Sequence, residues 1–281
     1  MKRSKDFTRS GGVHLIDTNG CEFGYELIQC VPHAYYRHLQ GEEVVVLTST
    51  NMQEWYYFLP KSNVYTKYKS REFTYPDGTE LNDIHWDNFN PQMWEGPNYT
   101  DHYKDFDLDL LGFGDKKFIF DKPLMFISNK YTKEWLNPPI NFLNLELLDK
   151  LFTRFKDSYT ILYNRPRPHN VPQDRAQEHF EFDDWNLIKS KHKEVIDLND
   201  YSKDNFNRLQ VILASRTKKF ISVQGGTSII SSMFGGENVI FARKGTELTK
   251  NSYSWYNRFA DTKVSHYNDY DELYNKVNKE W

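Results

Sequence analysis

The chain has few cysteines, no long apolar run and no large excess of charge. Its 281 residues include two cysteines, Cys21 and Cys30, which suggest neither a disulfide framework nor a zinc site. No apolar run approaches the roughly 20 residues that cross a bilayer, and no apolar signal core follows the basic residues at the start. We therefore expect a cytoplasmic protein without an integral membrane segment.

The net charge and the aromatic content of the chain indicate which kinds of molecule it could bind. A formal net charge of −3 gives no whole-chain attraction to nucleic acid, so no nucleic-acid partner is expected. Aromatic residues are abundant, with 19 Tyr and 20 Phe. Aromatic faces commonly form walls for sugar rings, although an AT-rich genome would explain the same composition.

Residues 219–241 predict a strand, a glycine turn, a short helix, a second turn and a second strand. Gly225–Gly226 allows the sharp turn, and Thr227 and Ser228 are favourable N-cap residues for the helix. A helix N-terminus would then lie at the carboxyl end of a parallel strand, where open α/β sheets bind phosphorylated ligands. The alternative is an ordinary βαβ unit whose glycines serve packing alone.

Strands and helices alternate along both halves of the chain. The first half predicts a strand at 13–16, a helix at 25–39 and a strand at 43–48. The second half predicts a longer series, with strands at 123–128, 159–163, 194–198, 220–223 and 237–241 and helices at 143–155, 203–215 and 272–277. This order predicts an α/β fold of two Rossmann-like domains facing a central cleft. Their expected ranges are 1–117, which includes an aromatic-rich insertion, and 118–281.

Polar loops follow several strands of the second domain, and neighbouring parallel strands bring such loops together. Lys130 and Arg165 would each supply a cation from a different loop, and the helix N-terminus would complete a diphosphate cradle. Asp197 and Leu198, after a short strand, could lie at the edge of a nucleobase. The predicted donor-binding residues are Asn129, Lys130, Arg165, Asp197, Leu198, Gln224, Gly225, Gly226, Thr227 and Ser228.

Several short segments, in order, resemble small GT-B glycosyltransferases of large algal viruses and bacterial polysaccharide clusters. They are Phe23–Leu27, Pro32–Tyr35, Lys122–Tyr131, Glu134–Trp135, Pro138–Asn141 and Gln224–Ser228. The resemblance implies a C-terminal half that binds a nucleotide sugar, an N-terminal half that holds a glycan acceptor, and no metal or other cofactor. It also implies a UDP- or GDP-linked donor, with xylose or fucose as the first sugars to consider. A viral origin would place the protein in the host cytoplasm. The oligomeric state is open.

An inverting transfer needs a base that removes the proton of the acceptor hydroxyl. Glu26 and His33, in the first loop and helix of the N-terminal half, are the main candidates, and Asp17 after the first strand is the third. Each has a structural alternative: a carboxylate at Glu26 favours a first helical turn, and His33 fits a hydrogen-bonded structural histidine.

Three other classes of protein compete with this interpretation. Asp105 and Asp107 form an Asp-x-Asp pattern, which is the metal-binding element of GT-A glycosyltransferases, although strand-like alternation also explains it. A nicotinamide or flavin oxidoreductase would need Gly-x-Gly-x-x-Gly, which fails after Gly112–Gly114. A non-catalytic module that binds nucleotides or glycans predicts binding without turnover of the donor.

Overall fold

The structure of the protein is a computed structural model. It describes residues 7–8, 12–19, 21–69, 95–107, 120–134, 137–167, 179–201 and 206–281. The chain divides into two compact units, 1–97 with 171–177, and 98–170 with 178–281. The predicted boundary between residues 117 and 118 and most of the aromatic-rich insertion lie outside the described residues. No helix among the described residues is long and apolar enough to cross a membrane.

The first unit is built on a four-stranded sheet in the order β1-β2-β3-β4. The three longer strands run parallel, and β1 pairs antiparallel with β2. The predicted strands at 13–16 and 43–48 are confirmed, whereas β4 was not predicted. The strands are β1 (Phe7–Thr8), β2 (Val13–Asp17), β3 (Glu43–Ser49) and β4 (Val64–Tyr68).

One continuous helical segment joins β2 to β3 and confirms the predicted helix. It consists of α1 (Phe23–Tyr25), a π-helical turn η1 (Glu26–Cys30) and α2 (Val31–Leu39). Pro32 does not end the segment; it lies just after the π-helical turn, where the Val31 N–H bonds to the Glu26 carbonyl five residues back instead of making the i→i−4 bond that a proline disrupts. Short 3₁₀ helices follow at η2 (Gln53–Tyr56) and η3 (Lys61–Asn63).

The second unit is built on a six-stranded parallel sheet in the order β10-β9-β8-β5-β6-β7. When the six strands are renumbered in chain order within this unit, their order across the sheet is that of a Rossmann fold. Strands β5 to β7 follow one another toward one edge and β8 to β10 toward the other, so the order reverses between β5 and β8. The structure therefore confirms an α/β fold with parallel sheets. The strands are β5 (Leu124–Ser128), β6 (Thr160–Asn164), β7 (Ile196–Asp197), β8 (Lys219–Val223), β9 (Glu237–Phe241) and β10 (Lys263–Tyr267).

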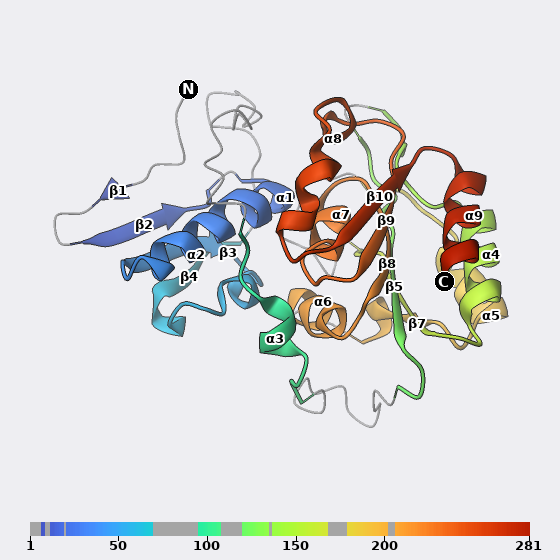
Figure 1. Cartoon of the computed structure of the whole chain (residues 1–281), viewed down its shortest axis with the longest axis horizontal. Coiled ribbons are helices and arrows are strands. Elements are labelled where there is room, and N and C mark those ends of the chain that lie inside the picture. Colours follow the sequence, from blue (N-terminus) through green and yellow to red (C-terminus); the bar gives the residue numbers. More distant parts are fainter. Residues whose placement is uncertain are drawn as a thin grey trace. The chain divides into compact units, whose positions relative to one another are not determined.

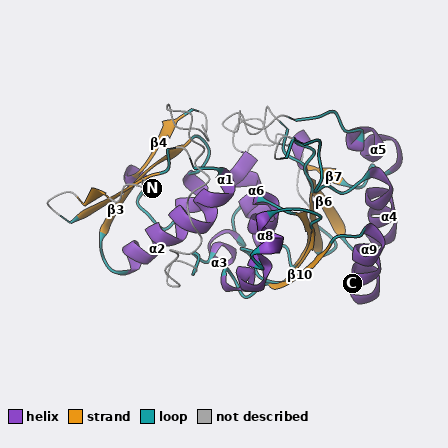
Figure 2. Cartoon of the chain, turned by 90° about the horizontal axis from the view of Figure 1, so that it is seen from above, coloured by secondary structure: helices purple, strands orange, loops and turns teal. Residues whose placement is uncertain are grey.

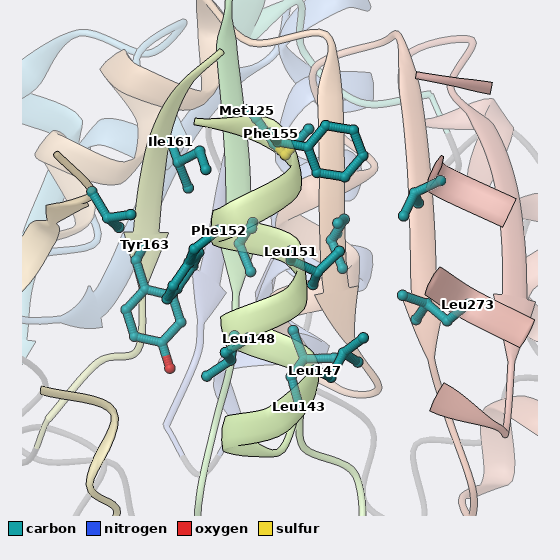
Figure 3. Packing of buried hydrophobic residues seen from close by; sticks show 14 of the residues in the cluster. Met125, Leu143, Leu147, Leu148, Leu151, Phe152, Phe155, Ile161, Tyr163 and Leu273 are labelled. Carbon is teal, nitrogen blue, oxygen red and sulfur yellow. The ribbon is translucent and has the colours of Figure 1, made fainter. Parts of the chain in front are cut away.

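Helices cover both faces of this sheet. On one face lie α4 (Leu145–Phe155), α5 (Asp184–Lys191) and α9 (Tyr270–Glu280), and on the other lie α6 (Phe206–Ser215) and α7 (Gly226–Ser231) (Figures 1 and 2). The α4 face is apolar: Leu147, Leu151 and Phe155 recur at helical spacing and are buried against the strands (Figure 3). The remaining elements are α3 (Tyr99–Tyr103), α8 (Thr246–Thr249), η7 (Leu198–Asp200) and η8 (Ser252–Arg258).

The α7 face of the sheet contains polar side chains that bond to one another. Asn238, in the middle of β9, accepts a hydrogen bond from Ser222 Oγ at 2.8 Å and donates to Ser232 Oγ at 3.0 Å. All three residues are fully buried. Because buried polar groups are costly unless they are paired, these bonds fix how the segment that contains α7 lies on the sheet.

Glu237, at the amino end of β9, ties the C-terminal helix to the sheet. Its Oε2 accepts hydrogen bonds from Lys219 Nζ and Trp281 Nε1, both at 2.9 Å. Burial alone raises the pKa of this carboxyl, but the two donors hold it below its ordinary value of 4.5. The ionised form is therefore the one that stabilises the fold.

We predict that Glu237→Gln lowers the free energy of unfolding by about 1.5–3 kcal/mol near neutral pH, since it weakens charge-assisted hydrogen bonds. A lowered folded-state pKa contributes stability above the unfolded-state pKa, and this contribution disappears as the pH falls through the folded-state value. Urea unfolding should therefore show a gap between wild type and variant that closes as the pH falls below the ordinary carboxyl value of 4.5. A gap that stays constant with pH would contradict the assignment.

Candidate functional site

The candidate site lies at the carboxyl ends of β5 and β8, where the strand order of the second unit reverses. Open α/β sheets bind ligands at such a switch point. Lys130 follows β5 and Gln224 follows β8, and the Lys130 Nζ atom lies 3.2 Å from the Gln224 Oε1 atom. The structure thus brings together two of the predicted donor-binding residues.

Asn141 connects the loops around this point. Its Nδ2 group donates to Glu134 Oε2 at 2.6 Å, to Gln224 Oε1 at 3.2 Å and to the Lys244 carbonyl at 2.9 Å. Its Oδ1 atom accepts from the backbone N–H groups of Arg243 and Lys244. Asn141 is fully buried, so one carboxamide fixes the loops that follow β5, β8 and β9.

The charged side chains that bond to Gln224 or Asn141 in the described structure include one lysine and two carboxylates. Lys130 Nζ pairs with Glu134 Oε1 at 2.9 Å, and Gln224 Nε2 donates to Glu247 Oε2 at 2.6 Å. An ammonium group suits a phosphate oxygen, and ionised carboxylates accept hydrogen bonds from hydroxyl groups. This combination fits a ligand that carries both phosphate and hydroxyls. We call Lys130, Glu134, Asn141, Gln224 and Glu247 the switch-point cluster.

Tyr253, in η8, lies next to this cluster. Burial, and then the charges of Glu247 and Glu134, raise the pKa of its hydroxyl. The side chain is buried and its hydroxyl has no hydrogen-bond partner in the described structure. Four residues here were not predicted as site residues: Glu134, Asn141, Glu247 and Tyr253. The segment Pro138–Asn141, which follows a strand and a polar loop, was the available signal in the sequence.

The glycine turn confirms one expectation and corrects another. Gly225 has a φ of +103°, and a Cβ atom there would lie 3.3 Å from Lys130 Nζ, so the turn needs glycine. Thr227 and Ser228 are not N-cap residues, because α7 begins at Gly226 with Gly225 as its N-cap. Their hydroxyls instead donate to the carbonyls of Val223 at 2.6 Å and Gly225 at 2.8 Å.

In the described part of the chain, the Arg165 side chain bonds to Asp184 and not to the residues of the switch-point cluster. Its guanidinium makes two hydrogen bonds to Asp184, Nε to Oδ2 at 2.5 Å and a terminal nitrogen to Oδ1 at 2.6 Å. Tyr163 donates to the same carboxylate at 2.6 Å. Both members of the pair are buried. Arg165 therefore neutralises a buried carboxylate in this structure, although the sequence placed it beside Lys130 as a phosphate ligand.

Three further predicted donor-binding residues have structural contacts. Asn129, the residue directly after β5, is fully buried and bonds to the backbone of Leu143. Its Nδ2 group donates to the Leu143 carbonyl, and its Oδ1 atom accepts from the Leu143 N–H. Asp197 accepts from the N–H and the amide of Asn199, and burial raises the pKa of its carboxyl. Leu198 is fully buried.

The candidate bases of the first unit differ in burial. Glu26 is fully buried, and its Oε1 atom accepts hydrogen bonds from the hydroxyls of Thr48 and of Tyr56 at 3.0 Å. Asp17, at the carboxyl end of β2, is half-buried and accepts from Tyr68. His33 is half-buried, and its Nε2 atom accepts from Arg37 at 3.3 Å. Asp17 and His33 are therefore more accessible than Glu26.

The Asp-x-Asp pattern lies beyond α3. Asp105 and Asp107 are exposed and follow the helix in an irregular segment rather than a strand; residues 108–111 lie outside the described part. Within the described ranges, no three His, Cys, Asp or Glu side chains are grouped to hold a metal ion.

Among known proteins, similarity to this chain is found at the level of solved structures. No protein-family model matches the chain, and no curated protein matches its sequence. Among solved structures, the chain is similar to three structures of the wall teichoic acid polymerase TagF. They are two different histidine variants, and the second of these variants after a soak with CDPG. The identities are 12–14%, the TM-scores 0.33–0.35, and 87% of this chain is covered. The chain spans about half the length of those proteins, 50–52%. At these values the likeness carries no argument about activity.

We predict that Asp184→Asn lowers the free energy of unfolding by about 3–5 kcal/mol, because it leaves the Arg165 guanidinium buried without its counter-charge. Tyr163→Phe is the comparison variant, since it removes the hydrogen bond that Tyr163 donates to the same carboxylate and the one that it accepts from Asn129, and it should cost about 1.5–3 kcal/mol. Chemical denaturation of the three proteins measures both values. Equal effects of the two substitutions would show that the ion pair is not the main contribution.

Proposed function

We propose that the protein is a glycosyltransferase that uses a nucleotide diphosphate sugar, and that its second unit binds this donor. The observation that carries the proposal is the switch-point cluster. It lies where Rossmann-type sheets bind nucleotides, and it combines a lysine with carboxylates and amides. The resemblance of the sequence to GT-B glycosyltransferases supports the same function independently of the geometry.

In the proposed complex, Lys130 turns from Glu134 toward the diphosphate and stabilises the charge of the leaving nucleotide. Because Gly225 has no Cβ atom, it leaves room beside the Lys130 ammonium group. Glu247 and Glu134 accept hydrogen bonds from hydroxyls of the donor. The Tyr253 hydroxyl, which has no partner in the described structure, donates to an oxygen of the same ligand.

The finer features of the proposal come from the sequence resemblance. The donor is UDP- or GDP-linked, with xylose or fucose as the first sugars to test, and the acceptor is a glycan hydroxyl. The transfer inverts the configuration and needs no metal ion. The first unit supplies the base from Asp17, His33 or Glu26. The half-buried positions of Asp17 and His33 favour these two over Glu26, whose carboxylate is enclosed.

A non-catalytic nucleotide-binding module is the second candidate, because the cluster geometry concerns binding rather than turnover. A transferase assay distinguishes the two, since a module would bind the nucleotide sugar without releasing the nucleotide. Chelation distinguishes the metal-dependent alternative: complete loss of turnover with EDTA, restored by manganese, would favour the pattern at Asp105 and Asp107.

We predict that one nucleoside diphosphate, screened with and without magnesium, raises the melting temperature of the protein through binding linkage. Lys130→Gln should then weaken its affinity by about 10–100-fold, as expected for a charge-assisted contact. Lys150→Gln is the control, because Lys150 is exposed and pairs with Glu146 on the surface of α4. Calorimetry that gives equal affinities for both variants would remove Lys130 from the site.

We predict that substitution of the true base lowers turnover by about 10²–10⁴-fold and leaves donor affinity unchanged. The variants to compare are Asp17→Asn, His33→Ala and Glu26→Gln, each checked for a cooperative melt. Glu26→Gln should lower the melting temperature, because Glu26 accepts hydrogen bonds from Thr48 and Tyr56 in the core. If all three variants keep full turnover, the inverting mechanism with a base from the first unit is wrong.

A further inference from the structure

The two cysteines of the chain lie in contact. The Cys21 and Cys30 Sγ atoms are 3.8 Å apart, and both residues are buried with 5% exposure. Cys21 lies in the turn after β2, where its N–H donates to the Thr18 carbonyl at 3.0 Å. Cys30 is the last residue of the π-helical turn η1. The sulfurs are thus in van der Waals contact, and a disulfide requires them to approach to about 2.05 Å.

We propose that Cys21 and Cys30 form a reversible intramolecular disulfide when the protein meets a disulfide oxidant such as oxidised glutathione. The Cys21 thiolate attacks one glutathione sulfur and releases one glutathione, which leaves a mixed disulfide on Cys21. The Cys30 thiolate then attacks the Cys21 sulfur and releases the second glutathione. The two cysteine protons end on the two released thiols, and the oxidant gains the two electrons that the cysteines lose.

The order of attack follows from the surroundings of each cysteine. Cys21 lies in an irregular segment close to the exposed residue Asn19, whereas Cys30 lies within a continuous helical segment. Local opening of a turn costs less free energy than opening of a helix. Cys21 is therefore the residue that reaches the oxidant, and Cys30 is the one that resolves the mixed disulfide.

The bond would cross-link two segments that carry polar groups of the first unit. Cys21 belongs to the turn that follows Asp17, and Cys30 belongs to the π-helical turn that begins with Glu26. Oxidation would thus restrict the motion of the two segments that carry Asp17 and Glu26. The formation of the bond does not depend on the proposed transferase activity.

The test exposes the reduced protein to oxidised glutathione and measures its intact mass and its free thiols after denaturation. Since the chain has two cysteines, the expected result is a monomer that has lost two hydrogens and both thiols, and that dithiothreitol restores. Its melting temperature should rise by about 3–8 °C, as for a short cross-linked loop. Two thiols that persist, or a disulfide-linked dimer, would overturn the proposal.

Two single variants test the order of attack. Cys30→Ser should retain one glutathionyl group on Cys21, because no second thiol resolves the mixed disulfide, and Cys21→Ser should stay unmodified under the same conditions. Modification of Cys21→Ser but not of Cys30→Ser would overturn the assigned order. The wild-type mass and thiol count decide the main proposal even if either variant fails to fold.

Discussion

The carboxamide of Asn141 is the interaction on which the candidate site depends. It bonds at once to Glu134, to Gln224 and to the backbone at residues 243 and 244. These groups come from the loops after three different strands, so no single loop fixes the arrangement. Full burial strengthens each bond and makes any loss costly. The polar groups of the switch point are therefore positioned before a ligand arrives.

The two faces of the six-stranded sheet are packed by different kinds of interaction, apolar contacts on one face and hydrogen bonds between polar side chains on the other. The α4 face is filled with leucine and phenylalanine, whose burial is non-directional and stabilises the unit. The other face contains hydrogen-bonded amides, Asn238 with Ser222 and Ser232, and Asn164 with Gln210 of α6 at 2.9 Å. Hydrogen bonds are directional, so they set the position of α6 and of the α7 segment relative to the strand ends that form the site.

The sequence predicted the strands with apolar runs, including the half-buried β2 and β3 and the short edge strand β7, and missed the edge strands β1, β4 and β10. β5 and β9 are continuous apolar or buried runs, whereas β10 and β4 contain lysine and exposed side chains. The same rule about strand ends selected both Lys130 and Arg165. Lys130 lies beside Gln224, which follows the neighbouring strand, as the rule expects. The rule could not foresee the partner of Arg165, because Asp184 reaches it only through the packing of α5.

The charge balance of the switch-point cluster bears on what it could select. Lys130 is opposed by Glu134 and Glu247, so these three side chains together carry a formal negative charge. A ligand that draws Lys130 onto its phosphates leaves Glu134 without its ion-pair partner in a buried position, which is costly unless another donor replaces it. Hydroxyl groups on the same ligand would supply that donor. In the proposed function, the two carboxylates thus oppose simple phosphates and favour a molecule that joins phosphates to a polyhydroxylated ring.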